Sequence, residues 1–429
     1  MGRAPGTAGG DPGAACVGSP GRWQNDPGRP PGHPARRPLT PRPPTHRSLA
    51  PIALILLGMA AGWETSEPLI ASLTSTGVER TVEVVLSLLL FLDALEIKDA
   101  PHKNRTPVFR MLFLALPLSL LVMFFVAAYL LPDVRLSLCL VLACILVPSD
   151  LAPASSLVKD RRIPARVRNL LNVESGYNDA IVAPFFLFGL AVLGQGEHAE
   201  DPGEALVALV PALVMALAVG AAVGAALGWG IRLAHTHGWA EIPALRLVTL
   251  ATPLLAYTLA VQFSANGFVA AFIAGLVFRT VVGDLLHELL EFAEGVATFA
   301  IMPIWFVLGQ LTALVIQSGP DWDVALVVLI ALTLGRAIPV FLATTPSRLT
   351  WPERATVAWL GPRGIASIVF ALLAIQEGDE GQVEIIIQAV VMVVFLSVML
   401  HGLTAPLIGR AFGKRRTPAL DSALDPAAT

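Results

Sequence analysis

Long apolar runs separated by short polar segments recur along the chain from residue 49 to residue 408. Runs of this length are typical of helices that cross a bilayer, because about 20 helical residues span its hydrocarbon core. The short alternating segments of a membrane β-barrel do not occur in the sequence. The pattern therefore predicts an all-α polytopic membrane protein with about twelve transmembrane helices. The predicted spans are residues 49–63, 81–97, 107–131, 136–158, 170–193, 205–231, 245–263, 267–282, 296–316, 324–344, 355–376 and 383–408.

The polar segments between these spans form two sets that alternate along the chain. One set is rich in Lys and Arg, as at residues 159–168 and 410–416. The other set is poor in Lys and Arg, as at residues 197–204 and 377–384. By the positive-inside rule, this alternation predicts an even number of spans in the cell (plasma or inner) membrane, with both termini in the cytoplasm.

Composition agrees with a membrane protein. Hydrophobic residues make up 55% of the chain and charged residues only 14%, whereas soluble domains carry about 25% charged residues. The net charge of −3 is uninformative by itself, and no nucleic-acid partner is predicted. The three cysteines, Cys16, Cys139 and Cys144, do not have the spacing of a metal site. The predicted partner is the lipid bilayer.

Three regions follow from the distribution of apolar residues. Residues 1–47 are rich in Pro, Gly and Arg and are predicted to be disordered. Residues 48–410 form the transmembrane domain, and residues 411–429 form a short cytoplasmic tail. Within the transmembrane domain, the segment 285–294 has glutamates at three-residue spacing, which favours an amphipathic surface helix in a loop.

The most informative stretch is 172–180, NVESGYNDA, at the start of an apolar segment. It carries two carboxylates (Glu174, Asp179), an amide (Asn178) and a hydroxyl (Ser175). On a helix these four side chains lie within a sector of about 140°. A charge at the bilayer centre costs about 2.5–3.5 kcal/mol on insertion scales, so it needs compensation or has a use. One polar face on an apolar helix suits a cation site, and the alternative is a cytoplasmic helix start with a polar N-cap.

Four charged residues are predicted to lie at one depth. Asp150, Asp179, Arg336 and Arg363 each lie eight or nine residues inside the cytoplasmic end of their predicted span, roughly 12–13 Å deep. Charged residues at this depth face the interior of the bundle. We therefore expect two acids and two arginines to converge.

Two of the four helices are predicted to be broken. The segments 146–153 (LVPSDLAP) and 361–364 (GPRG) place proline or glycine beside the charged residue. Proline removes a backbone donor, so carbonyl groups there lose their partners and become available to an ion. The spans that carry Asp179 and Arg336 are predicted to be unbroken. A simple kink is the alternative for each proline taken alone.

These motifs resemble those of bacterial sodium/proton exchangers, in the Asn-Asp branch of the monovalent cation:proton antiporter family. The resemblance covers roughly residues 49–410 and implies two inverted repeats, a homodimer, elevator-type alternating access and no cofactor besides the transported ions. This chain has a proline-rich segment where the family usually has a further helix. The matching motifs are NVESGYND at 172–179, LVPSDLAP at 146–153, GPRGIASI at 361–368, FLDAL at 91–95 and GRAIPVF at 335–341.

The resemblance also implies roles for single residues. Asp179 resembles the carboxylate that binds the cation and the proton, and Asn178 resembles its amide partner. Ser149, Asp150 and Ser175 resemble the rest of the site, with Asp179 and Asp150 as the carboxylates for a monovalent cation. Ser149 stands where the family usually has Thr, which keeps the hydroxyl.

The remaining matches are charged residues around the site. Glu174 and Arg336 resemble the core salt bridge, Arg363 resembles the arginine of the second broken helix, and Asp93 matches an acidic position in one branch of the family. From the residues alone, two questions stay open. Asp150 is either a ligand or a residue behind the ligands, and Asp93 is either part of a cytoplasmic funnel or an ordinary interfacial charge.

The predicted function is secondary-active exchange of a monovalent cation, Na⁺ first, for H⁺. Competition of both ions for Asp179 couples the two fluxes, and one exchanging carboxylate predicts electroneutral transport. K⁺/H⁺ exchange at the same site is the alternative. An ion channel is a rival class, as is an intramembrane enzyme that uses Asp150 with Asp179, or a serine with His401, which is the only histidine within a predicted span. The protein is predicted not to be an enzyme.

Overall fold

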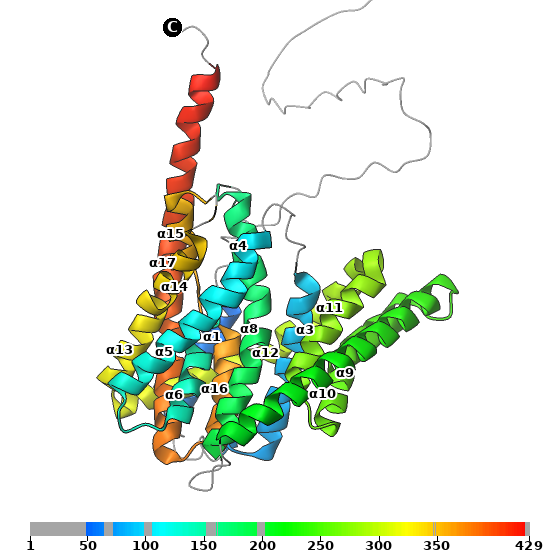
Figure 1. The fold of residues 1–429 in the computed structure, drawn as a ribbon, viewed down its shortest axis with the longest axis horizontal. Coiled ribbons are helices and arrows are strands. Elements are labelled where there is room, and N and C mark those ends of the chain that lie inside the picture. The colour runs from blue at the N-terminus through cyan, green and yellow to red at the C-terminus, as the bar shows by residue number, and fades with distance from the viewer. Residues whose placement is uncertain are drawn as a thin grey trace, which may run out of the picture. The chain divides into compact units, whose positions relative to one another are not determined.

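The computed structural model describes most of the chain beyond residue 48. The described residues are 49–63, 72–97, 105–151, 160, 162–194, 202–345, 347 and 349–424. Residues 1–47, which we predict to be disordered, lie outside this range, as does Pro153 of the first predicted break. Within the described residues all regular structure is helical (Figure 1), which confirms the predicted fold class.

The helices follow the predicted spans in order. The elements are α1 (Leu49–Gly62), α3 (Thr76–Glu96), α4 (Arg105–Arg110), the π-helix η2 (Met111–Ala115), α5 (Leu116–Leu130), α6 (Leu136–Leu146), α8 (Ala165–Gly194), α9 (Pro202–Thr236), α10 (Ile242–Gln262), α11 (Gly267–Val282), the 3-10 helix η5 (Gly283–Leu285), α12 (Leu286–Ser318), α13 (Trp322–Leu332), α14 (Leu334–Thr344), α15 (Trp351–Trp359), α16 (Ile365–Glu377) and α17 (Glu380–Leu424).

Seven helical stretches in the described residues are long and apolar enough to cross a membrane. One of them, Gly267–Ser318, contains both α11 and α12. Three shorter apolar helices add to these, at Pro51–Gly62, Leu136–Leu146 and Ile365–Glu377. The chain is therefore a multi-pass membrane protein, and the count of twelve spans stays a prediction.

Among the described residues, the helices are interrupted at three places inside the predicted spans. The first two are the predicted ones: α6 ends at Leu146, before Pro148, and residues 360–364 separate α15 from α16. The third corrects the prediction that the Arg336 span is unbroken. It separates α13 from α14 at Thr333, whose φ of −118° and ψ of −95° are not helical.

Two other local predictions are also refined. Residues 285–294 are helical, but the segment is not a separate surface helix in a loop, because it forms the end of η5 and the first turns of α12. At the other end of the molecule, α17 continues through residue 410 to Leu424, so no helix break marks the start of the predicted tail.

Close helix packing depends on glycines. A Cβ atom on Gly220 or Gly224 of α9 would lie 2.4 Å from a carbonyl oxygen of α11. A Cβ atom on Gly58 of α1 would lie 2.0 Å from the Phe306 carbonyl oxygen of α12. Small residues allow backbones to approach this closely, which is the usual packing of helices in membranes. Figure 1 shows α9, α10 and α11 side by side, and their mutual contacts agree.

Candidate functional site

The polar stretch 172–180 lies within α8, and its side chains face two different surroundings. Glu174 contacts the first break and α14, Asn178 contacts the first break, and the two are 4% and 0% exposed. Ser175 and Asp179 line a cavity on another side of the helix. The polar sector of α8 therefore faces two environments: protein groups that bury Glu174 and Asn178, and a cavity lined by Ser175 and Asp179.

The first break, after Leu146, forms several of its hydrogen bonds with side chains of α8. Ser149 Oγ donates to Glu174 Oε1 over 2.8 Å, and Asn178 Nδ2 donates to the Ser149 carbonyl oxygen over 2.7 Å. The Leu151 N–H donates to Ser175 Oγ over 3.2 Å. Buried backbone groups need partners, and side chains of α8 supply them where the α6 ladder stops.

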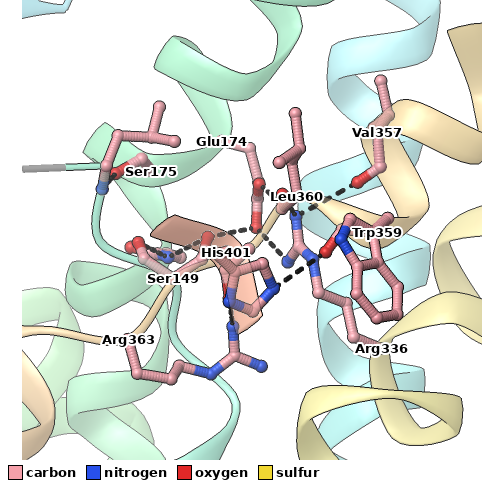
Figure 2. Close-up of polar contacts among 12 residues, drawn as sticks. Ser149, Glu174, Ser175, Arg336, Val357, Trp359, Leu360, Arg363 and His401 are labelled. Carbon is pink, nitrogen blue, oxygen red and sulfur yellow. Dashed lines mark hydrogen bonds and ion pairs between the residues drawn. The ribbon is translucent and has the colours of Figure 1, made fainter. Parts of the chain in front are cut away.

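Glu174 and Arg336 form a buried ion pair (Figure 2). Arg336 Nη1 and Nη2 donate to the two Glu174 carboxylate oxygens over 3.0 and 2.9 Å. Arg336 is 5% exposed and also donates to the Leu360 carbonyl oxygen over 2.9 Å. This bidentate geometry is the strong form of an Arg–carboxylate contact, and here it joins α8, α14 and the end of α15.

Arg363 lies in the second break and is 1% exposed. Its Nε donates to the Leu146 carbonyl oxygen over 2.6 Å, and its Nη2 lies 3.5 Å from the Ala331 carbonyl oxygen. It also donates to the Gly361 carbonyl oxygen through Nη1. The guanidinium group therefore lies at the carboxyl ends of α6 and α13. A cation is favourable there because the last carbonyl groups of a helix carry partial negative charge.

Asp150 joins the two breaks to each other. Its N–H donates to the Pro362 carbonyl oxygen over 2.7 Å. Its Oδ2 accepts from the Ile365 N–H over 3.1 Å, at the start of α16. A carboxylate at a helix N-terminus is stabilised by the free N–H groups and the helix dipole. A Cβ atom on Gly364 would lie 2.2 Å from this Oδ2, so only glycine permits the contact.

The cavity beside Asp179 has a volume of about 410 Å³ and is strongly acidic. Its lining contains Ser175 and no Lys or Arg among the described residues. Asp179 is 7% exposed, and its Oδ1 is buried with no hydrogen-bond partner among the described residues. A cavity of one charge sign attracts counter-ions, and carboxylate oxygens are ligands that hard cations prefer. The carboxylates that line it are Asp93, Glu96, Asp150, Asp179 and Glu294.

The cavity brings together predicted and unpredicted residues. Asp93 lies in its wall with Asp150 and Asp179. The sequence did not single out Glu96 or assign Glu294 to the site. Glu96 has a sequence signal, because it lies three residues after Asp93 and so on the same face of α3. Glu294 has only the glutamate spacing that indicated a surface helix.

The chain matches the family model described as sodium/hydrogen exchanger, transmembrane, over residues 47–411. It is 25% identical over 318 residues to the Na(+)/H(+) antiporter of Schizosaccharomyces pombe, a match that covers 68% of this chain and 66% of that protein. It is 24% identical over 279 residues to the K(+)/H(+) antiporter NhaP2 of Shewanella sp. strain MR-4, covering 61% of this chain and 45% of that protein. The chain thus spans less than two thirds of the length of these relatives.

The fold is also that of a solved structure. The sodium proton antiporter MjNhaP1 from Methanocaldococcus jannaschii superposes with a TM-score of 0.69 at 20% identity, covering 84% of this chain and 91% of that chain. An electron-microscopy structure of the same protein gives a TM-score of 0.58 at 18% identity, covering 76% and 83%. Because the family model matches residues 47–411, which are most of this chain, the chain belongs to the sodium/hydrogen exchanger family.

Proposed function

We propose that this chain is a secondary-active antiporter that exchanges a monovalent cation, Na⁺ first, for H⁺ across the cell membrane. The observation that carries the proposal is Asp179, a buried carboxylate on a membrane helix that lines an acidic cavity and has one oxygen without a hydrogen-bond partner among the described residues. Its ionised form holds the cation and its neutral form holds the proton. Competition for this one group couples the two fluxes and needs no cofactor.

Neighbouring groups complete the proposed site. Ser175 and Asp150 line the same cavity and offer a hydroxyl and a carboxylate. Asn178 and Ser149 bind each other behind Asp179, and Asn178 Oδ1 accepts from the Asp179 N–H over 2.7 Å. We assign Asp150 and Ser175 to the cation and Asn178 and Ser149 to the support of Asp179. Asp93 leads cations into the cavity from the cytoplasm.

The cation is assigned by analogy. One relative named above is a Na(+)/H(+) antiporter and another a K(+)/H(+) antiporter, so K⁺ is the second candidate for this site. By the same family analogy, we propose a homodimer, elevator-type movement of the helices that carry the site, and cytoplasmic termini.

The test is reconstitution of the full chain in proteoliposomes with an imposed pH gradient and a pH-sensitive dye inside. Addition of Na⁺ is expected to dissipate the gradient with saturable dependence on its concentration. Li⁺ and K⁺ are added separately, and protein-free liposomes correct for leak. Saturation at lower K⁺ than Na⁺ would reassign the cation, and no cation-dependent proton flux with any of the three would refute antiport.

A further inference from the structure

Ser397 and His401 of α17 contact the residues on either side of the second helix break. Both are fully buried, at 0% and 1% exposure. The Arg363 N–H donates to Ser397 Oγ over 2.6 Å. His401 Nε2 lies 3.0 Å from the Trp359 carbonyl oxygen, a contact drawn in Figure 2. One turn of α17 therefore holds the chain on both sides of residues 360–362.

Each ring nitrogen of His401 lies near a carbonyl oxygen, which can only accept. Nε2 lies 3.0 Å from the Trp359 carbonyl oxygen, and Nδ1 lies 2.9 Å from the Ser397 carbonyl oxygen and 3.2 Å from Ser397 Oγ. With the ring proton on Nε2, His401 donates to the Trp359 carbonyl oxygen. The Ser397 hydroxyl oxygen accepts from the Arg363 N–H whichever nitrogen carries the proton. One helical turn of α17 therefore contacts both Trp359 and Arg363.

The backbone of the second break also connects Trp359 to the acidic cavity. Four successive carbonyl groups at the break, from Trp359 to Pro362, each accept from a different group. The donors are His401 Nε2, Arg336 Nη2, Arg363 Nη1 and the Asp150 N–H. The last contact and the Ile365 N–H fix Asp150, which lines the cavity. A shift of the break therefore moves a carboxylate of the cation site.

We propose that Ser397 and His401 are positioning residues, through which α17 fixes both sides of the second break and thereby sets the place of Asp150 in the cavity. Neither side chain lines the cavity, so neither touches the cation. The proposal rests on the proposed function only for its effect on transport. The backbone part of it is independent of any transported ion.

The first experiment measures amide hydrogen exchange of the peptide that contains residues 359–366, in the purified full chain. His401→Leu and Ser397→Ala are expected to exchange about tenfold faster there, since each removes a hydrogen bond at the break. His401→Gln keeps an amide donor and is expected to stay near the native rate. Thr404→Val is the matched control, because Thr404 Oγ1 accepts from the Trp359 indole over 2.9 Å and donates to the Leu400 carbonyl oxygen of its own helix, and so bonds to no backbone group of the break.

The second experiment measures exchange in proteoliposomes. His401→Leu is expected to raise the KM for the cation about fivefold, with His401→Gln and Thr404→Val close to native. A merely structural role would lower folded yield and leave KM unchanged in the folded fraction.

If the native chain moves no protons, the proposed function fails, and hydrogen exchange alone decides this proposal. Native exchange rates at the break in both Ser397→Ala and His401→Leu overturn it, and if His401→Leu does not fold, Ser397→Ala decides. Equal effects of Thr404→Val and His401→Leu also overturn it.

Discussion

Glu174 and Asp179 lie five residues apart on α8, and their carboxylates have opposite surroundings. Arg336 donates to both oxygens of Glu174, and Ser149 donates to one of them. The cavity beside Glu174 and Arg336 has a volume of about 10 Å³, which is about the space that one water molecule needs. Asp179 instead borders a cavity of about 410 Å³, and its Oδ1 has no partner among the described residues.

Burial does not explain this difference, since the two residues are 4% and 7% exposed. The difference comes from the groups that contact each carboxylate. A carboxylate that already receives a bidentate guanidinium contact has both oxygens occupied and has little reason to bind another cation. A carboxylate among other carboxylates, with an unsatisfied oxygen, gains by binding a cation or a proton. We infer that Glu174 holds the helices together and that Asp179 exchanges ions.

The strongest test of this contrast is Asp179→Asn. The substitution keeps the shape of the side chain and removes the charge that binds the cation or the proton. We expect a folded, membrane-inserted protein with no cation-driven proton flux above that of empty liposomes. Asp93→Asn in the same cavity is the comparison and is expected to retain measurable flux. Flux at the native level in Asp179→Asn proteoliposomes would show that another group carries the ions.

The contrast predicts a different defect at the ion pair. Arg336→Ala leaves the Glu174 charge buried without its partner, which costs about 3–5 kcal/mol in comparable cases. We expect a lower melting temperature in detergent and a lower folded yield. The double variant Glu174→Gln with Arg336→Gln removes both charges and is expected to recover much of the loss. Equal melting temperatures for the single and double variants would mean that the pair does not stabilise the fold.

Much of this arrangement is predictable from local sequence, because the relevant signals are local. Prolines mark the breaks at Pro148 and Pro362, since proline cannot donate to a helix ladder. The polar sector of α8 follows from the helical repeat.

The rest depends on contacts between distant elements. The break at Thr333 lies in the apolar sequence LIALTLG, which has no proline. The Ala331 carbonyl oxygen beside it lies near Arg363, 32 residues away in the chain. Glu294 has the spacing of an exposed helix face, and only the packing of α12 brings it to the cavity of α8. No local pattern contains that information.

Substitutions at two glycines of the second break can test the ion pair and the acidic cavity separately. A Cβ atom on Gly361 would lie 2.1 Å from Arg336 Nε, whereas one on Gly364 would lie 2.2 Å from Asp150 Oδ2. Gly361→Ala is therefore expected to destabilise the protein by about 1–3 kcal/mol, the usual cost of overpacking. Gly364→Ala is expected to raise the KM for the cation about tenfold, equivalent to about 1.4 kcal/mol, with a smaller change in melting temperature.

Melting temperature and KM, measured on both variants, check this prediction. Each glycine serves as the control for the other, because both lie in the same break and gain the same methyl group. If the two variants show the same pattern of defects, the ion pair and the cavity are not separable units.

The smallest expected effect concerns voltage, because the contrast predicts exchange of one cation for one proton. Glu174 is paired with Arg336, and Asp150 accepts from the Ile365 N–H at the N-terminus of α16. The amide of Asn178 carries no proton that titrates. Asp179 is then the carboxylate whose partner changes in each cycle, so no net charge crosses the membrane.

A second transported charge would couple the cycle to voltage by about 2.3 kcal/mol per 100 mV. The measurement is steady-state exchange in proteoliposomes in which valinomycin and K⁺ gradients set the potential, once K⁺ has been shown not to be a substrate. Rates at fixed Na⁺ and H⁺ gradients are expected to be the same at each potential. A rate that rises steeply with potential would mean that Asp150 or Asp93 also exchanges its proton, and Asp150→Asn and Asp93→Asn would show which of the two removes the voltage dependence.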